Sequence, residues 1–138
     1  MSLARFVFLA VSVERPDETL AEGVAWMLIS PNNRPLGRSW ALYPGYTAAT
    51  EAVGALRTGF GEIKVSPSLA NDQGQWNWRI DLRGEPVAGA TRSYLRIREC
   101  AYNLECFLTA VPVARVVAGA RAVRGGRWRG GDAAKALR

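Results

Sequence analysis

Trp76-Asn77-Trp78-Arg79-Ile80, followed by Arg83-Gly84-Glu85-Pro86-Val87-Ala88, is the stretch that decides the fold, because the chain carries it twice. The earlier copy reads Trp26-Met27-Leu28-Ile29 and then Arg34-Pro35-Leu36-Gly37. In both copies a segment rich in aromatic and branched apolar residues leads into a turn and a second extended segment, which is typical of a β-hairpin. Because an internal repeat constrains the architecture more than any single motif, the sequence predicts one structural unit used twice.

A helix is expected after each hairpin and a further strand before it. Apolar residues at helical spacing follow both hairpins, and β-type segments precede them, separated from the hairpins by loops with turn chemistry. The unit β-β-β-α, used twice, predicts an α+β fold with a mainly antiparallel sheet and helices packed on one face. The expected helices are residues 47–59 and 94–109. The strands expected before the hairpins are Phe6–Val13 and Glu62–Val65, and the loops that follow these strands are 14–23 and 67–75.

The length of 138 residues suits one domain of this kind. Its expected bounds are 1–113, with copy one over about 3–60 and copy two over about 61–113. Residues 114–138 are then a basic, Arg- and Gly-rich tail for which we expect a flexible structure.

The repeated strings resemble the YegP-like family of small domains of unknown function. The resemblance rests on Trp76-Asn77-Trp78-Arg79-Ile80, the turn Arg83-Gly84-Glu85, Tyr94, and a helix containing Cys100 and Leu104. It implies two copies that share one continuous sheet with strand exchange between them. Since single-copy relatives are thought to pair as two chains, the resemblance leaves a monomer or a homodimer open for this tandem chain.

Positive charge is concentrated at the C-terminus. Residues 1–112 contain 11 Lys or Arg and 11 Asp or Glu, whereas residues 113–138 contain 7 Lys or Arg and one acid, so the net charge of +6 lies in the tail. A neutral body with a basic arm is typical of an interaction tail for a polyanion such as RNA or DNA, through guanidinium–phosphate pairing and base stacking. A solubilising tail with no specific ligand is the alternative, because two Arg-Gly-Gly triplets are a weak match for the longer arrays of nucleic-acid binders. The nucleic-acid-binding candidates are Arg121, Arg124, Arg127, Trp128 and Arg129.

The segment before the Gly-rich stretch allows two interpretations. Val113, Val116 and Val117 fit one face of a short cationic amphipathic helix, but Gly119 disfavours a helix. β-branched residues and the family resemblance favour a closing strand over residues 112–117. Since a Gly-rich segment buries little surface, we expect removal of residues 119–138 to leave the melting temperature nearly unchanged.

No catalytic constellation is evident. The chain has no His, which removes the commonest general base and metal ligand. Cys100 and Cys106 lie six positions apart on one predicted helix, beyond disulfide reach, and no ligand quartet for zinc accompanies them. We therefore expect no catalytic residue, no metal and no cofactor.

The aromatic residues divide into two groups. Trp26 and Trp78 occupy equivalent strand positions and are expected in the core, where their N–H groups need partners. Trp40, Tyr43 and Tyr46 surround an insertion in copy one and are the candidates for a protein-binding surface.

These observations favour a non-enzymatic accessory or interaction module that binds a protein partner; the alternative is an RNA- or DNA-associated protein that uses its basic tail. No segment reaches the roughly 20 apolar residues of a membrane span. We expect a cytoplasmic, bacterial protein.

Overall fold

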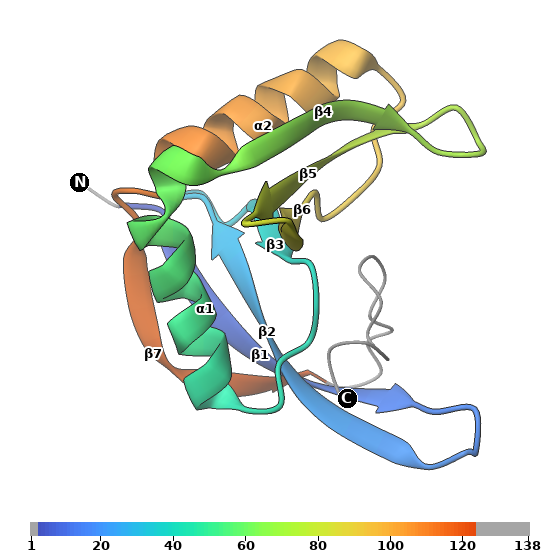
Figure 1. The fold of residues 1–138 in the computed structure, drawn as a ribbon, viewed down its shortest axis with the longest axis vertical. Coiled ribbons are helices and arrows are strands. Elements are labelled where there is room, and N and C mark those ends of the chain that lie inside the picture. Colours follow the sequence, from blue (N-terminus) through green and yellow to red (C-terminus); the bar gives the residue numbers. More distant parts are fainter. Residues whose placement is uncertain (1–2, 124–138) are drawn as a thin grey trace.

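The computed structural model describes residues 3–123, which form two helices and seven strands (Figure 1). The helices correspond to the two predicted from periodicity. The bounds are β1 (Arg5–Glu14), β2 (Leu20–Ile29), β3 (Pro35–Ser39), α1 (Tyr46–Thr58), β4 (Lys64–Ala70), β5 (Trp76–Leu82), β6 (Glu85–Gly89), α2 (Ile97–Ala110) and β7 (Arg115–Val123), with a short 3₁₀ turn at Phe60–Glu62 after α1.

All seven strands belong to one sheet with the order β4-β5-β6-β3-β2-β1-β7. Neighbouring strands pair antiparallel except β1 and β7, which are parallel, so the sheet is mixed. The strands of the two hairpins meet at the β3–β6 pair, where Arg38 lies opposite Gly89 and Ser39 opposite Ala88. The expected α+β class is therefore confirmed, and the sheet is mixed through its one parallel pair.

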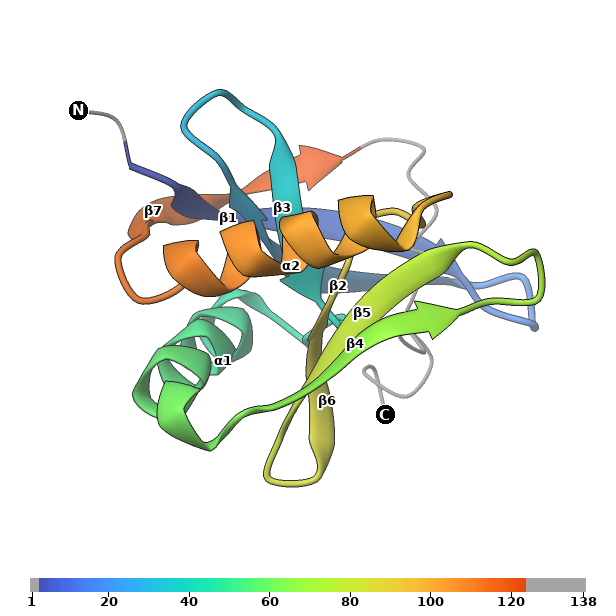
Figure 2. The same cartoon turned by 90° about the horizontal axis from the view of Figure 1, so that it is seen from above.

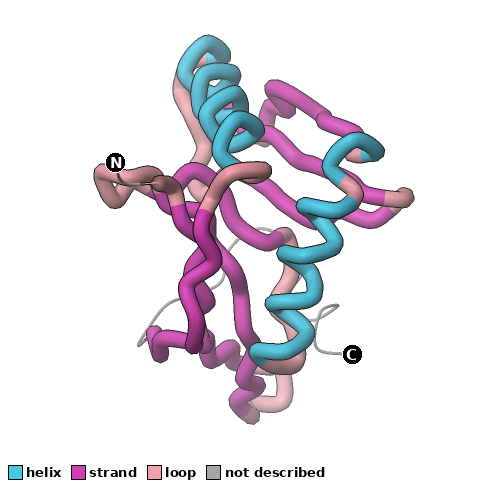
Figure 3. Tube along the Cα trace, turned by 90° about the vertical axis from the view of Figure 1, so that its left-hand side faces the viewer, coloured by secondary structure: helices cyan, strands magenta, loops and turns pink. Residues whose placement is uncertain are grey.

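One hydrophobic core joins both helices to the same face of this sheet. Trp26 and Trp78 are each 1% exposed, as the sequence predicts. Phe107 of α2 connects them, with ring centroids 6.2 Å from Trp26 and 4.7 Å from Trp78. Val53 and Leu56 of α1 belong to the same cluster. The two helices, cyan in Figure 3, are inclined to each other and cover one face of the sheet.

The strands before the hairpins are longer than the sequence indicates, so the loops are shorter. β1 and β2 pair along their full lengths, from Arg5 opposite Ile29 to Glu14 opposite Leu20. β4 runs through Pro67, although proline has no N–H to donate to a ladder. The edge position of β4 and the register shift between Ser66 and Leu69 accommodate it. The turn-type composition of 14–23 and 67–75 therefore predicted loops that are longer than the loops in the structure.

The last strand corrects the expected limit of the folded domain. Arg115–Val123 form β7 beside β1, so the sheet includes residues that the sequence assigned to a tail beginning at 114, and the amphipathic-helix alternative for this segment is wrong. The expected strand over 112–117 starts later and continues further. Gly119 has φ 88° and lies within the register shift of β7 against Phe6 and Phe8, a conformation that favours glycine.

Candidate functional site

The face of the sheet opposite the helices presents a polar pocket. A Cβ atom added to Gly37 would lie 2.5 Å from Cδ2 of Phe107, so Gly37 faces α2. Since side chains alternate along a strand, its neighbour Arg38 points to the helix-free face. By the same alternation Asn77 lies opposite the buried Trp78. Arg38 and Asn77 thus reach the same side of the sheet from β3 and β5.

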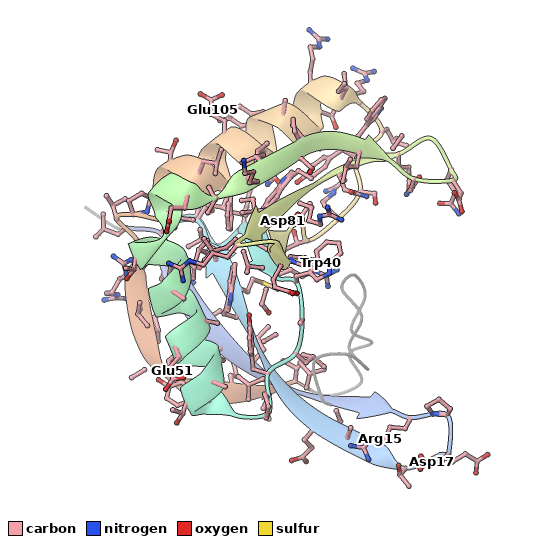
Figure 4. The ribbon with its side chains drawn as sticks, in the orientation of Figure 1. Arg15, Asp17, Trp40, Glu51, Asp81 and Glu105 are labelled. Atoms are coloured by element: carbon pink, nitrogen blue, oxygen red, sulfur yellow. The ribbon has the colours of Figure 1, made fainter. Side chains whose placement is uncertain are left out.

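Trp40, just after β3, forms one wall of this pocket. A Cβ atom at Gly89 would lie 2.9 Å from the indole, so the ring packs directly on the backbone of β6. The guanidinium carbon of Arg79 lies 5.9 Å from the ring centroid, and Nε of Arg79 lies 2.9 Å from a carboxylate oxygen of Asp81. Figure 4 labels Trp40 and Asp81, the two residues that Arg79 contacts. These contacts hold the indole in place.

We call this cavity the Trp40 pocket; its volume is about 460 Å³. Two guanidinium groups, two amides, two hydroxyls and the indole line it, and none of its described lining residues is acidic. Burial lowers the pKa of the half-buried Arg38 from its usual value. The polar lining residues are Arg38, Gln75, Asn77, Thr91, Arg92 and Ser93.

A second cavity, which we call the arginine groove, adjoins the first. It has a volume of about 750 Å³ and shares Thr91 and Arg92 with the Trp40 pocket. Its walls are the turn between β2 and β3 with the start of β3, the segment before α2, and α2 itself. Figure 2 shows β3 passing next to α2. Its charged lining residues are Arg34, Arg92, Arg96, Arg98 and Glu99.

The arginine groove is strongly electropositive. Among the described residues the ion pairs are Arg79–Asp81 and Arg83–Glu62, and neither contributes an arginine to this groove. Arg92 instead lies over the ring of Tyr94, 5.1 Å from its centroid. The N-terminus of α2, which follows Arg96, adds the positive end of a helix dipole. Four cations therefore face a single carboxylate.

Two tyrosines of the groove have perturbed hydroxyls. Burial raises the pKa of Tyr94, against an opposing effect of Arg92. A hydrogen bond with the Cys106 thiol raises the pKa of Tyr102. Both shifts favour the protonated hydroxyl, and the hydroxyl of Tyr102 is already engaged with the Cys106 thiol.

The three aromatic residues predicted to form a protein-binding surface do not form one patch. Tyr43 is half-buried against the core, exchanges backbone hydrogen bonds with Val24, and has its pKa raised by burial. Tyr46 is 37% exposed, but its ring packs on Phe8 and its hydroxyl accepts a 2.9 Å hydrogen bond from the backbone N–H of Gly119. Only Trp40 lines a pocket.

Of the five nucleic-acid-binding candidates, the structure describes only Arg121. It is exposed on β7, opposite Leu9 of β1. Arg124, Arg127, Trp128 and Arg129 lie outside the described residues.

Sequence reasoning missed both cavities. The net charge of residues 1–112 is zero, and this sum does not show that arginines gather on one part of the folded surface. A usable signal was the segment 91–98, which contains three arginines and no acid. Arg34 and Arg38 join these arginines only through folding, because the β2–β3 hairpin lies beside α2.

The described residues contain no group of three or more His, Cys, Asp or Glu side chains placed to hold a metal ion. Cys100 is buried in the core and Cys106 is half-buried, and the two do not form a disulfide with each other. Over residues 3–123 there is also no helix of the length and apolarity that crossing a bilayer requires.

Comparison with known proteins identifies the fold. No family model and no curated protein sequence matches the chain. Two solution NMR structures do match. The protein of unknown function yegP from E. coli is 12% identical, with a TM-score of 0.58 over 92% of this chain and 99% of that protein. A UPF0339 protein from Shewanella oneidensis is 9% identical, with a TM-score of 0.59 over 91% and 96%. At these identities the likeness shows a shared fold.

Proposed function

We propose that the chain is a YegP-like protein built from two β-β-β-α repeats. The fold shared with yegP along nearly the whole chain supports this assignment. The burial of Trp26 and Trp78 at equivalent strand positions supports the repeat, as does the meeting of the two hairpins at β3 and β6. Strand β7 follows α2 as β4 follows α1, but it pairs with β1 of the other copy, consistent with a shared sheet.

We further propose a non-enzymatic interaction module whose arginine groove binds an acidic segment of a protein partner. The observation that carries this proposal is the groove itself, where Arg34, Arg92, Arg96 and Arg98 face the single carboxylate of Glu99. A partner that carries carboxylates neutralises these charges through bidentate guanidinium contacts.

Exposed apolar side chains beside the groove favour a peptide over a purely ionic partner. Leu95 is 77% exposed, Ile97 47% and Tyr102 69%, and all three lie on the segment that supplies Arg96 and Arg98. Protein interfaces are enriched in Tyr and Arg and bury apolar side chains at their centres. The preferred segment therefore combines acidic with aliphatic residues.

Fluorescence polarisation tests this proposal with defined probes. A labelled peptide of alternating Glu and Leu is compared with one in which Ser replaces Leu, and with a single-stranded oligonucleotide of equal charge. We expect the Glu-Leu peptide to bind most tightly, and Arg34→Gln, Arg96→Gln and Arg98→Gln together to weaken its binding at least tenfold.

The matched control removes the same charge elsewhere, through Arg15→Gln, Arg83→Gln and Arg115→Gln at exposed positions outside both cavities. It should change the affinity less than threefold. Equal weakening by the two triple variants would show that only net charge matters. Tighter binding of the oligonucleotide, lost in the groove variant, would assign the groove to nucleic acid.

RNA or DNA association through the basic C-terminal residues is the second candidate function. The observation that favours it is the concentration of the +6 net charge in residues 113–138. Phosphate contacts by such a segment require no folded pocket.

A further inference from the structure

The Trp40 pocket differs from the arginine groove in shape and chemistry. Four arginines from several walls line the groove, whereas the Trp40 pocket combines two arginines with an indole, two amides and two hydroxyls. Its volume of about 460 Å³ lies within the range of small-molecule sites. It therefore has the size and polarity of a ligand pocket.

Its charge selects an anion. Arg38 and Arg92 both line the pocket, and no described lining residue carries a negative charge. Arg38 is half-buried on β3, and a guanidinium keeps its charge even where burial disfavours it. Phosphate and carboxylate oxygens match the fork of guanidinium N–H groups that Arg38 and Arg92 bring to the pocket.

The remaining walls suit a flat ring with polar edges. Trp40 is fixed by the backbone of Gly89 and by Arg79, which is itself paired with Asp81, so the indole wall is in place before a ligand arrives. The amides of Gln75 and Asn77 each offer donors and an acceptor, which is what the edge of a heterocycle requires. A rigid aromatic wall and adjacent amides together favour a planar heterocycle over an aliphatic chain.

We propose that the Trp40 pocket binds a small anionic ligand with a planar ring, of the nucleoside monophosphate class, with Arg38 and Arg92 holding the anion and Trp40 and Asn77 holding the ring. This ligand site adjoins the peptide contact proposed for the groove and shares Thr91 and Arg92 with it. A planar ring that carries a carboxylate in place of the phosphate has related chemistry, and the test distinguishes these two kinds of anionic ligand.

The experiment follows the indole N–H signals of the full chain by NMR, with the Trp40 signal assigned from Trp40→Phe. The probes are adenosine 5′-monophosphate, adenosine, inorganic phosphate and benzoate. We expect adenosine 5′-monophosphate to shift the Trp40 signal saturably, and adenosine and phosphate to bind at least tenfold more weakly. Equal affinity for benzoate would identify a ring carboxylate as the source of the same chemistry.

Two substitutions test the assignment. Arg38→Met keeps the apolar stem but removes the charge, and should weaken binding of the monophosphate at least tenfold. Arg15→Gln, at the far end of the β1–β2 hairpin in Figure 4, should change it less than twofold. If Arg38→Met destabilises the fold, Ser93→Ala at the pocket rim serves in its place, with an expected loss of at least threefold.

Three outcomes would overturn the proposal. The first is no saturable shift of the Trp40 signal with any of the four probes. The second is equal weakening by the pocket variants and Arg15→Gln. The third is binding of a single-stranded oligonucleotide without binding of the mononucleotide, which would make the pocket part of a nucleic-acid path.

Discussion

Trp78 is held by a polar contact that its sequence position does not reveal. Its indole N–H donates to Oδ1 of Asn103 at 2.6 Å, and Nδ2 of Asn103 donates to the carbonyl of Leu36 at 3.2 Å. This chain of hydrogen bonds links β5, α2 and β3 inside the core. Hydrophobic pattern predicted that Trp78 is buried, but not its partner, because a polar residue on a helix is normally assigned to the exposed face.

Substitution of Asn103 tests how much that contact contributes. Asn103→Ala leaves a buried indole N–H without an acceptor, so we expect a loss of about 1–3 kcal/mol in the free energy of unfolding. Denaturant unfolding measures it. In the background of Trp78→Phe the donor is absent, and the same substitution should be less destabilising. Equal losses in both backgrounds would contradict a role for this hydrogen bond.

Two glycines should respond to alanine with opposite signs. A Cβ atom at Gly37 would overlap Phe107 and lie 2.8 Å from the Trp78 ring, so Gly37→Ala should destabilise the protein by about 1–3 kcal/mol. Gly54 is exposed within α1 with no neighbour within 4 Å of such an atom, so Gly54→Ala should stabilise it by about 0.5–1 kcal/mol. Thermal unfolding of both variants checks the pair, and a shift of the same sign in both would be inconsistent with this packing.

At the scale of elements, the sequence predicted the number and order of helices and strands better than their ends. Periodicity located α1 and α2, because each buries one apolar stripe against the sheet. The turns around Asn33 and Arg83 also formed where expected, with φ of 67° and 53°. β4 and β7 were misjudged because they are edge strands, where Pro67 and Gly119 are tolerated through register shifts.

Two truncations separate β7 from the residues beyond it. Deletion after residue 118 removes the pairing of Ala120–Val123 with Phe8–Val11, whereas deletion after residue 123 keeps it. We expect the shorter chain to be less stable by about 1–3 kcal/mol, since each ladder hydrogen bond contributes roughly 0.5–1.5 kcal/mol. This revises the expectation that removal of residues 119–138 leaves the melting temperature unchanged. Equal melting temperatures of the two chains would show that the second half of β7 adds no stability.

At the scale of the whole molecule, the sequence predicted an interaction protein, which stays a prediction, and it did not reveal the two cavities. Charge counting assigned all excess charge to the C-terminus, whereas folding also gathers Arg34, Arg38, Arg92, Arg96 and Arg98 around two adjoining cavities. These residues lie on two segments far apart in the sequence, 34–38 and 92–98, and only folding brings the two segments together. Trp40 lines a cavity, whereas Tyr43 and Tyr46, which the sequence grouped with it, pack elsewhere; a role of Trp40 in binding stays a prediction.

The distribution of charge over the molecule leads to a test of nucleic-acid binding. If the C-terminal residues are responsible for nucleic-acid binding, deletion of residues 124–138 should abolish binding of single-stranded RNA. This deletion removes Arg124, Arg127, Trp128 and Arg129 together. Trp128→Ala alone should weaken RNA binding by about 1–3 kcal/mol if the Trp128 ring stacks on a base. Affinity is measured across a salt series, where each phosphate contact to a single strand contributes about −0.7 to the slope of log affinity against log salt.

The groove variant Arg34→Gln, Arg96→Gln and Arg98→Gln supplies the complementary arm of that test. If the C-terminal residues alone contact phosphates, the salt slope of this variant should equal that of the unmodified chain. A slope reduced by about 2, which is three contacts at about 0.7 each, would instead place RNA along the groove. RNA binding by the truncated chain that is as tight as that of the full chain at the same salt would exclude the C-terminal residues, and the affinity would then reside in the folded surface.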